Sequence, residues 1–145
     1  MPTEYDVRRL GPGDSAHLTL VADGVFDGEV KMHLADRFLC GNHNVLVVAF
    51  DADVVVGMGS AFIYCHPDKE PEMWVNEVGV SPVHRKKGIA GRIMAELESV
   101  AIAEGWSECW LLTEADNVAA NALYQSLADW KGPKEQVMYE HRLPR

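Results

Sequence analysis

Cysteine is scarce in this chain, and its spacing fits no metal site. The 145 residues include three cysteines, Cys40, Cys65 and Cys109, an odd number at wide intervals. Neither a Cys-x-x-Cys pair nor a Cys/His ligand pattern occurs, so the sequence predicts no bound metal. Reduced thiols of this kind are typical of a cytosolic protein, and we expect a cytoplasmic location.

Long apolar runs and a basic surplus are also lacking. No run approaches the ~18–20 apolar residues of a membrane span, and the polar, acidic start (Met1 to Asp6) is not expected to be a signal peptide. Lys and Arg number 13 against 22 Asp and Glu, a net charge of −9. This charge argues against general binding of nucleic acid and would attract cationic amines, although solubility alone also explains it.

The totals are those of an ordinary globular protein. Hydrophobic residues make up 48% of the chain and charged residues 24%. The length suits one domain with a proper core, and there are no internal repeats, low-complexity segments or linkers. We therefore expect a single domain over residues 1–145.

Hydrophobic periodicity predicts a mixed α/β order. Gly57 and Gly59, within one of the predicted strands, indicate a bulge or a close contact. The order strand, hairpin, strand and helix predicts a sheet that is antiparallel early and parallel once the helix crosses over. We expect strands over 5–10, 45–50, 54–64, 73–80, 108–113 and 137–143, and helices around 18–25, 30–38, 88–104 and 117–127.

A basic stretch followed by small residues lies between the strand at 73–80 and the helix that begins near Gly88. Pro82 cannot donate to a central ladder, so the strand should end near Ser81. Small residues let a ligand approach the backbone, and the first N–H groups of a helix lack internal partners at the positive end of its dipole. The pattern predicts a phosphate site, although three cations before a helix also suit a solvated face.

Two short motifs resemble those of one enzyme family. The run Arg85-Lys86-Lys87-Gly88-Ile89-Ala90 resembles the pattern Gln/Arg-x-x-Gly-x-Gly/Ala of the GCN5-related N-acetyltransferases (GNAT), whereas a nucleotide P-loop would need Lys and Ser/Thr after the glycine. The run Asn117-x-x-Ala120-x-x-Leu123-Tyr124 resembles a second GNAT signature. The glycine that often follows it in the family is missing, which puts that turn in question. The resemblance is specific over about residues 74–127.

The resemblance implies a GNAT fold, with a central mixed antiparallel/parallel β-sheet flanked by helices, and acetyl-CoA as the acetyl donor. It also implies that the helical region near the N-terminus forms part of the acceptor wall. The pyrophosphate would bind at 85–91, the pantetheine arm would follow a splayed strand edge at 78–80, and the Val78 N–H would donate to the thioester carbonyl. The implied coenzyme-binding residues are Val78, Gly79, Val80, Arg85, Lys86, Lys87, Gly88, Ile89, Ala90, Gly91, Asn117 and Ala120.

Two residues are candidates for proton transfer. Glu77 should emerge on the face opposite Val78, where a partly desolvated carboxylate could act as general base. The run 77–85 is similar to that of some aminoglycoside 3-N-acetyltransferases, which carry an acidic residue at the matching position. Glu77 could instead order the strand or bind a substrate cation. Tyr124 is the candidate acid by its place in the second signature, although its helix face also suits a core aromatic.

These patterns together predict an acetyl-CoA-dependent N-acetyltransferase for a primary amine of a small molecule, such as an aminoglycoside-like cation. We expect a homodimer with no nucleic-acid or membrane partner. A protein or peptide amine is the alternative acceptor. A non-catalytic acyl-CoA-binding module is the alternative function, which the presence of both Glu77 and Tyr124 disfavours.

Overall fold

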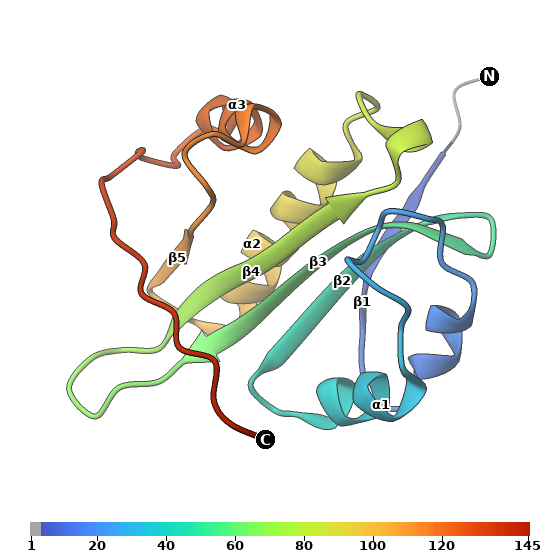
Figure 1. Cartoon of the computed structure of the whole chain (residues 1–145), viewed down its shortest axis with the longest axis horizontal. Coiled ribbons are helices and arrows are strands. Elements are labelled where there is room, and N and C mark those ends of the chain that lie inside the picture. The colour runs from blue at the N-terminus through green and yellow to red at the C-terminus, as the bar shows by residue number, and fades with distance from the viewer. Residues whose placement is uncertain (1–3) are drawn as a thin grey trace. The chain divides into compact units, whose positions relative to one another are not determined.

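The computed structural model describes residues 4–145, and the chain divides into two compact units (Figure 1). The first unit ends at Leu112 and contains β1 (Asp6–Leu10), η1 (Ser15–Thr19), α1 (Met32–Cys40), β2 (Asn44–Asp51), β3 (Val54–Tyr64), β4 (Glu72–Val80), η2 (Pro82–His84), α2 (Ile89–Glu104) and β5 (Glu108–Leu111). The second unit, Thr113–Arg145, contains α3 (Val118–Ser126). Across 4–145, no helix has both the length and the apolar character needed to cross a membrane.

The five strands form one sheet in chain order, β1-β2-β3-β4-β5. The pairs from β1 to β4 are antiparallel, and β4 pairs with β5 in parallel. Helix α2 lies between β4 and β5 in sequence and provides the crossover that a parallel pair requires. The predicted mixed sheet is confirmed.

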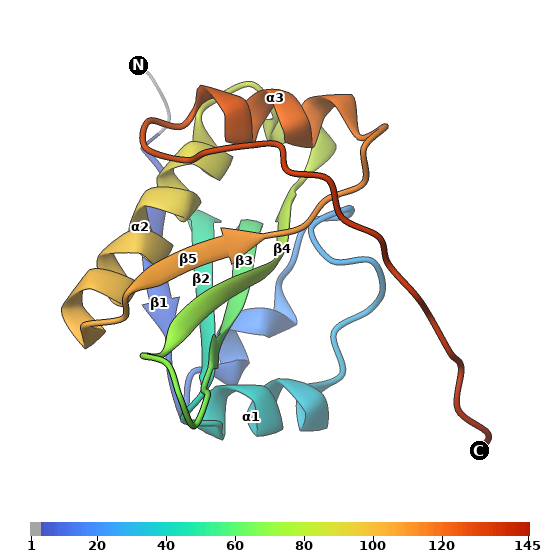
Figure 2. The same ribbon diagram turned by 90° about the vertical axis from the view of Figure 1, so that its left-hand side faces the viewer.

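Helix α2 packs closely on one face of the sheet (Figure 2). Its buried side chains include Ile89 and Ile93, which lie over Gly57 and Gly59 of β3. A Cβ at Gly57 would come within 2.9 Å of Ile89 Cγ2, so the glycine leaves room for the helix. Both glycines mark a close contact, as expected. The helix ends at Gly105 in a left-handed conformation, φ 76°, which glycine adopts without strain.

The other face of the sheet carries a second part of the core, which α1 helps to cover. The side chains that meet there come from β1 to β3, η1, α1 and the loop that follows η1. Burial of these apolar side chains contributes most of the stability of this layer. They are Leu10, Leu18, Val25, Ala35, Leu39, Leu46, Val48, Phe50, Val55 and Met58.

The helix expected around 18–25 does not form. A short 3-10 turn, η1, ends at Thr19, and the chain then runs extended. Val55 of β3 donates to the Leu20 carbonyl at 2.9 Å and accepts from the Ala22 N–H at 2.9 Å. These bonds occupy backbone groups that a helix would need, so pairing with β3 overrides the helical spacing of the apolar residues.

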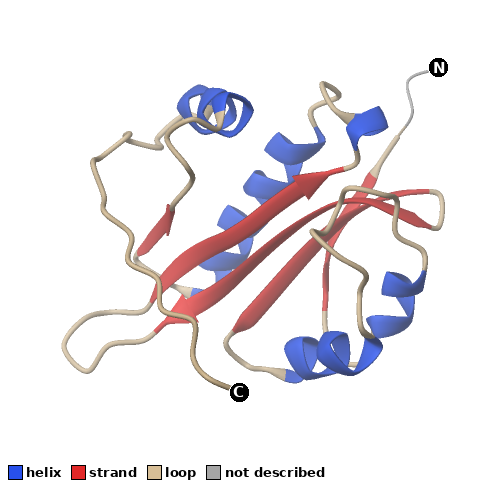
Figure 3. Cartoon of the chain, in the orientation of Figure 1, coloured by secondary structure: helices blue, strands red, loops and turns tan. Residues whose placement is uncertain are grey.

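The strand expected at 137–143 is also wrong. Figure 3 shows α3 followed by loop to the end of the chain, and residues 128–145 form no strand. A strand needs a partner for its backbone N–H and C=O groups, and the second unit contains none. Apolar side chains therefore stay exposed along this segment; Val137, Met138 and Tyr139 are 73%, 71% and 92% accessible.

Candidate active site

A bulge in β4 decides where Glu77 points. Val75 lies opposite Ala61 and Glu77 opposite Ser60, so Asn76 is an extra residue in β4. Strict alternation would place residue 77 on the same face as Met73 and Val75, which are buried. The bulge instead turns Glu77 to the opposite face, which it shares with Gly79. The Glu77 side chain is exposed there.

The outer edge of β4 is unpaired beyond the bulge. β5 pairs with β4 only from Glu72 to Val75. The Ser81 N–H donates to the Val56 carbonyl on the β3 side at 2.9 Å. Because N–H directions alternate along a strand, the N–H groups of Val78 and Val80 point away from β3, toward the side that β5 leaves open. The strand therefore presents free backbone donors and acceptors at the predicted coenzyme positions.

The loop after β4 continues this row of free donors. Within the described residues, no backbone N–H from 86 to 91 donates a hydrogen bond, and the first bond of α2 runs from Arg92 to the Gly88 carbonyl. Lys86 and Gly88 have left-handed φ angles of 62° and 78°. Left-handed residues in a turn bring successive N–H groups together into a concave anion site.

The charges around this loop have the sign that phosphate requires. Arg85, Lys86 and Lys87 are exposed, and none of them makes an ion pair with a carboxylate in the described part of the chain. Arg85 donates only a long hydrogen bond, 3.4 Å, to the Val80 carbonyl. The start of α2 adds the positive end of its dipole. Backbone donors and exposed cations of this kind suit a pyrophosphate, and the phosphate site at 85–91 stays a prediction.

His84 fixes the start of the loop. Its Nε2 lies 3.3 Å from Asp51 Oδ2 at the end of β2. A carboxylate only accepts, so the contact is a hydrogen bond in the form of His84 that carries a proton on Nε2. Nδ1 is buried without a hydrogen-bond partner among the described residues. The Tyr5 ring packs edge-on against the imidazole at 6.1 Å. The sequence offered no signal for this contact beyond the position of His84 next to the loop.

The loop after η1 lies directly on β4 and η2. A side chain at Gly79 would collide with the Val25 carbonyl, and a Cβ at Gly24 would lie 2.8 Å from Pro82 Cδ. The backbone of residues 24 and 25 therefore passes close to the end of β4 and to η2. η2 leads into the loop at 85–91, which we call the phosphate loop because a phosphate site is predicted there. This is the region that the family resemblance assigned to the acceptor wall, and the assignment stays a prediction.

The second signature lies entirely in the second unit, on α3. Asn117 caps the helix, because its Oδ1 accepts from the Ala120 N–H at 3.1 Å. The helix expected around 117–127 begins after this cap. Tyr124 is half-buried, and burial raises the pKa of its hydroxyl above the ordinary value. The hydroxyl therefore stays protonated at neutral pH, as a proton donor must.

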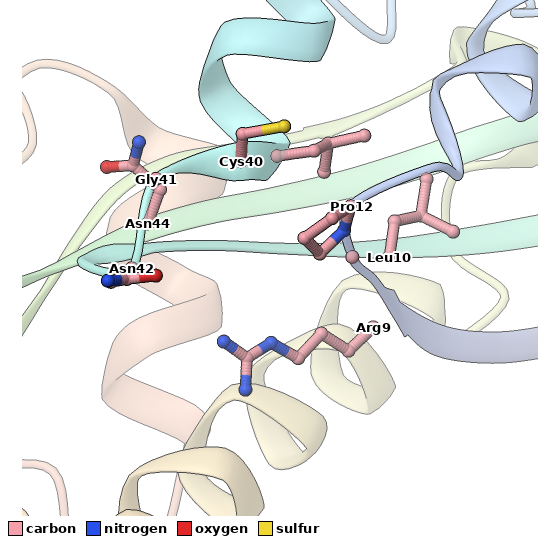
Figure 4. A pocket seen from close by; sticks show the side chains of 9 residues that line it. Arg9, Leu10, Pro12, Cys40, Gly41, Asn42 and Asn44 are labelled. Carbon is pink, nitrogen blue, oxygen red and sulfur yellow. The ribbon is translucent and has the colours of Figure 1, made fainter.

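Figure 4 shows a hollow, of about 360 Å³, that is lined by residues such as Leu10 and Asn44. By the strand register, this end of the sheet is opposite to the end at which β4 leads into the phosphate loop. The hollow is formed where β1 ends and β2 begins, beside the end of α1. Arg9 borders it and also pairs with Glu104, Nη1 to Oε1 3.8 Å. Its place in the sheet separates this hollow from β4 and its loop, so it is no part of the candidate active site. The lining residues are Arg9, Leu10, Gly11, Pro12, Leu39, Cys40, Gly41, Asn42 and Asn44.

Comparison with known protein families identifies the family of this chain. The model of the acetyltransferase (GNAT) family matches residues 19–128, most of the chain. The chain belongs to the GNAT family. It is therefore an acetyl-CoA-dependent N-acetyltransferase with a GNAT fold, as the two motifs predicted. No curated protein matches its sequence.

Solved structures of similar fold cover nearly the whole chain. An aminoglycoside acetyltransferase from an uncultured soil metagenomic sample, in complex with sisomicin, has a TM-score of 0.81 at 14% identity over 97% of each chain. AAC(6')-Iy, in complex with a bisubstrate analogue of CoA and acetylneamine, has a TM-score of 0.76 at 22% identity, over 97% of this chain and 99% of that chain. A ribosomal-protein-alanine N-acetyltransferase from Brucella melitensis has a TM-score of 0.73 at 20% identity, over 97% of this chain and 100% of that chain. The likeness to aminoglycoside acetyltransferases is confirmed at the level of fold.

The bulge at Asn76 is the main feature of the site that the sequence analysis missed. The sequence contained a signal for it. Met73 and Val75 fit a strand in which alternate residues are buried, and the next two residues, Asn76 and Glu77, are both polar. Two neighbouring polar residues break the period of two and indicate an inserted residue. In this GNAT domain the insertion gives β4 a polar side chain beside its free backbone edge.

Proposed function

We propose that this GNAT protein transfers the acetyl group of acetyl-CoA to a primary amine of a small, cationic molecule, such as an aminoglycoside. The observation that carries the proposal is the unpaired edge of β4 at Val78 and Val80, followed by the donor-rich loop 85–91. Together they offer an extended row of backbone groups for the pantetheine arm and a cationic end for the pyrophosphate. We further propose that the two compact units form one acetyltransferase domain, 1–145, which works in the cytoplasm as a homodimer without nucleic-acid or membrane partners.

The backbone of β4 has the role of holding and polarising the thioester. The free Val78 N–H donates to its carbonyl oxygen, which gains negative charge as the amine attacks. Gly79 and Val80 hold the arm in register, so that the reacting carbon is presented to the face on which Glu77 lies. Holding two reactants in this way can supply roughly 7–11 kcal/mol of the barrier.

Glu77 and Tyr124 move the protons. The Glu77 carboxylate takes a proton from the acceptor ammonium, directly or through water, because an ammonium has no lone pair for attack. The Tyr124 hydroxyl, whose pKa is raised by burial, donates to the departing sulfur. Asn117 and Ala120 would contact the coenzyme arm.

The acceptor class rests on two observations. The net charge of −9 attracts cations, and several neighbours of similar fold are named as aminoglycoside acetyltransferases. A protein or peptide amine is the second candidate, because another neighbour is named as a ribosomal-protein-alanine N-acetyltransferase. A parallel screen of aminoglycosides, polyamines, amino acids and peptides, read by release of free thiol from acetyl-CoA, separates these acceptors. A protein that binds acetyl-CoA and acetylates none of them would contradict both proposed acceptor classes.

Gly88→Glu tests the coenzyme site. The new carboxylate would repel the phosphates, and we expect acetyl-CoA binding in isothermal titration to weaken more than tenfold. Gly13→Glu is a matched control, because Gly13 also has a left-handed φ (88°) with open space around it, at the other end of the sheet. The control carries the same charge and backbone strain. Equal affinities of the two variants would refute the phosphate site.

Tyr124→Phe tests the proposed acid. The substitution keeps the ring and removes the hydroxyl, so turnover should fall about tenfold or more, with acetyl-CoA affinity nearly unchanged. Stopped-assay thiol release and isothermal titration measure the two quantities. Unchanged turnover would make Tyr124 a packing residue of α3.

A further inference from the structure

Four aromatic rings and a carboxylate gather where β3 and β4 meet at their hairpin end, on the face that Glu77 shares. Trp74 of β4 stacks on Trp110 of β5, with ring centroids 4.8 Å apart and 15° between planes. Phe62 packs against the other side of Trp74 at 4.8 Å. Tyr64 meets Trp110 edge-on at 6.3 Å and is 42% accessible. We call Phe62, Tyr64, Trp74 and Trp110 the aromatic row.

Glu72 lies within this row. Its Oε2 accepts from Trp110 Nε1 at 3.2 Å and lies 3.9 Å from His66 Nε2. The carboxylate stays partly accessible, at 20%. One indole donor leaves most of its acceptor capacity unused, so it can still bind an ammonium group.

A second carboxylate next to Glu72 makes this part of the surface negatively charged. Glu108 of β5 stands directly opposite Glu72 in the parallel register, and it is exposed. Like charges on neighbouring strands repel. In the described residues no Lys or Arg pairs with either carboxylate, and the ion-pair partner of Glu72 is His66, which is a cation only when protonated.

Of the four rings, Tyr64 is exposed, whereas Phe62, Trp74 and Trp110 are partly buried against one another. An exposed ring next to a carboxylate is a setting in which a cation binds by cation–π attraction.

From this geometry we infer that Glu72 and the aromatic row bind a second ammonium group of the acceptor, while its reacting amine lies at Glu77. The inference rests on the proposed function and narrows its substrate class. Glu72 and Glu77 lie on one strand and one face, separated by roughly 15 Å at the ordinary rise per residue. The acceptor is therefore an extended polycation that carries amines at both ends, such as a linear polyamine or a multi-ring amino sugar, rather than a single amino acid.

Isothermal titration with spermine, a long linear tetra-amine, and putrescine, a short diamine, tests this span. Glu72→Gln keeps an acceptor for Trp110 and removes the charge. We expect it to lower the ratio of spermine to putrescine affinity about fivefold. Glu70→Gln, an exposed loop residue with the same charge change, is the matched control and should leave the ratio unchanged. Glu108→Gln, at an exposed position that should tolerate the change, should lower the ratio about twofold.

Three results would overturn the second ammonium site. Equal losses in Glu72→Gln and Glu70→Gln would mean that only surface charge attracts spermine. Equal losses for spermine and putrescine would mean that the two-point span is wrong. An unchanged ratio in both Glu72→Gln and Glu108→Gln would leave the row as hairpin packing. The titration reads binding without turnover, so a protein that binds spermine in this way and acetylates nothing would contradict the proposed function alone.

Discussion

The two halves of β4 share one strand but have different neighbours. From Glu72 to Val75 the strand is paired on both sides, and Met73 and Val75 are fully buried. From Glu77 to Val80, β3 is its strand partner within residues 4–145, and no strand pairs with its outer edge there. The paired half stabilises the sheet, whereas the open half keeps backbone groups available to a ligand. One extra residue, Asn76, separates the two.

The largest expected effect comes from the open half. Glu77→Gln keeps the size of the side chain and removes the proton acceptor, so turnover should fall ~10²–10⁴-fold while thermal stability is unchanged. Raising the pH should recover part of the rate, because more of the acceptor amine is then neutral. A pH–rate profile beside Glu70→Gln measures this. A higher KM with intact kcat would instead make Glu77 a substrate anchor.

Substitutions in the paired half of β4 should lower the free energy of unfolding. Met73→Ala removes a fully buried side chain and should lower the free energy of unfolding by about 2–5 kcal/mol. Asn76→Ala, at the exposed bulge, should change it by less than about 0.5 kcal/mol. Urea unfolding of both variants compares them. Similar losses at both positions would show that the bulge is as important for stability as the paired half.

Gly79→Ala challenges the simple division between the halves. A methyl group there would meet the Val25 carbonyl, so the loop after η1 would have to move. We expect a loss of about 1–3 kcal/mol in the free energy of unfolding. Gly28→Ala, in the same loop with open space and an ordinary φ, should be neutral. If Gly79→Ala were equally neutral, the loop would not be tightly seated on β4.

The smallest effect concerns Cys109, which stands opposite Met73 in the paired half. Burial, with a smaller contribution from the Glu98 charge, raises the pKa of the Cys109 thiol. At a given pH it therefore holds less of the reactive thiolate than an ordinary thiol. Iodoacetamide labelling followed by mass spectrometry should modify the exposed Cys40 and Cys65 first, and Cys109 should gain most from a rise in pH. Equal rates in the folded protein would show that the paired half opens readily.

Much of the fold was predictable because local pattern and tertiary contacts agree. The apolar strands β2 to β4 and helix α2 appear where the periodicity placed them, and α2 begins directly after Gly88 as expected. The phosphate loop was predictable for a related reason, since free N–H groups follow from any helix start. The helix around 18–25 failed because a distant residue, Val55, binds the backbone there. No local pattern contains that information.

The site was predictable in residue type more than in arrangement. Simple alternation with Val78 correctly placed Glu77 on the face of Gly79, but the sequence did not foresee the bulge that puts both residues on the face opposite Met73 and Val75. The contact of His84 with Asp51 and the gathering of Trp74 and Trp110 depend on strand register. Register is set by the whole sheet, so residues far apart in sequence meet without a local signal. The catalytic roles of Glu77 and Tyr124 stay predictions.

The glycines of β3 have a consequence beyond packing. Gly57 and Gly59 set how near α2 approaches the sheet, and the phosphate loop is attached to the start of α2. The distance between the phosphate loop and the strands is therefore determined by two glycines that need not contact the coenzyme. A methyl group at either position would push α2 away from the sheet, and the phosphate loop would then move away from the free edge of β4. Loss of coenzyme affinity in a β3 variant would then report a change of spacing in an otherwise intact binding loop.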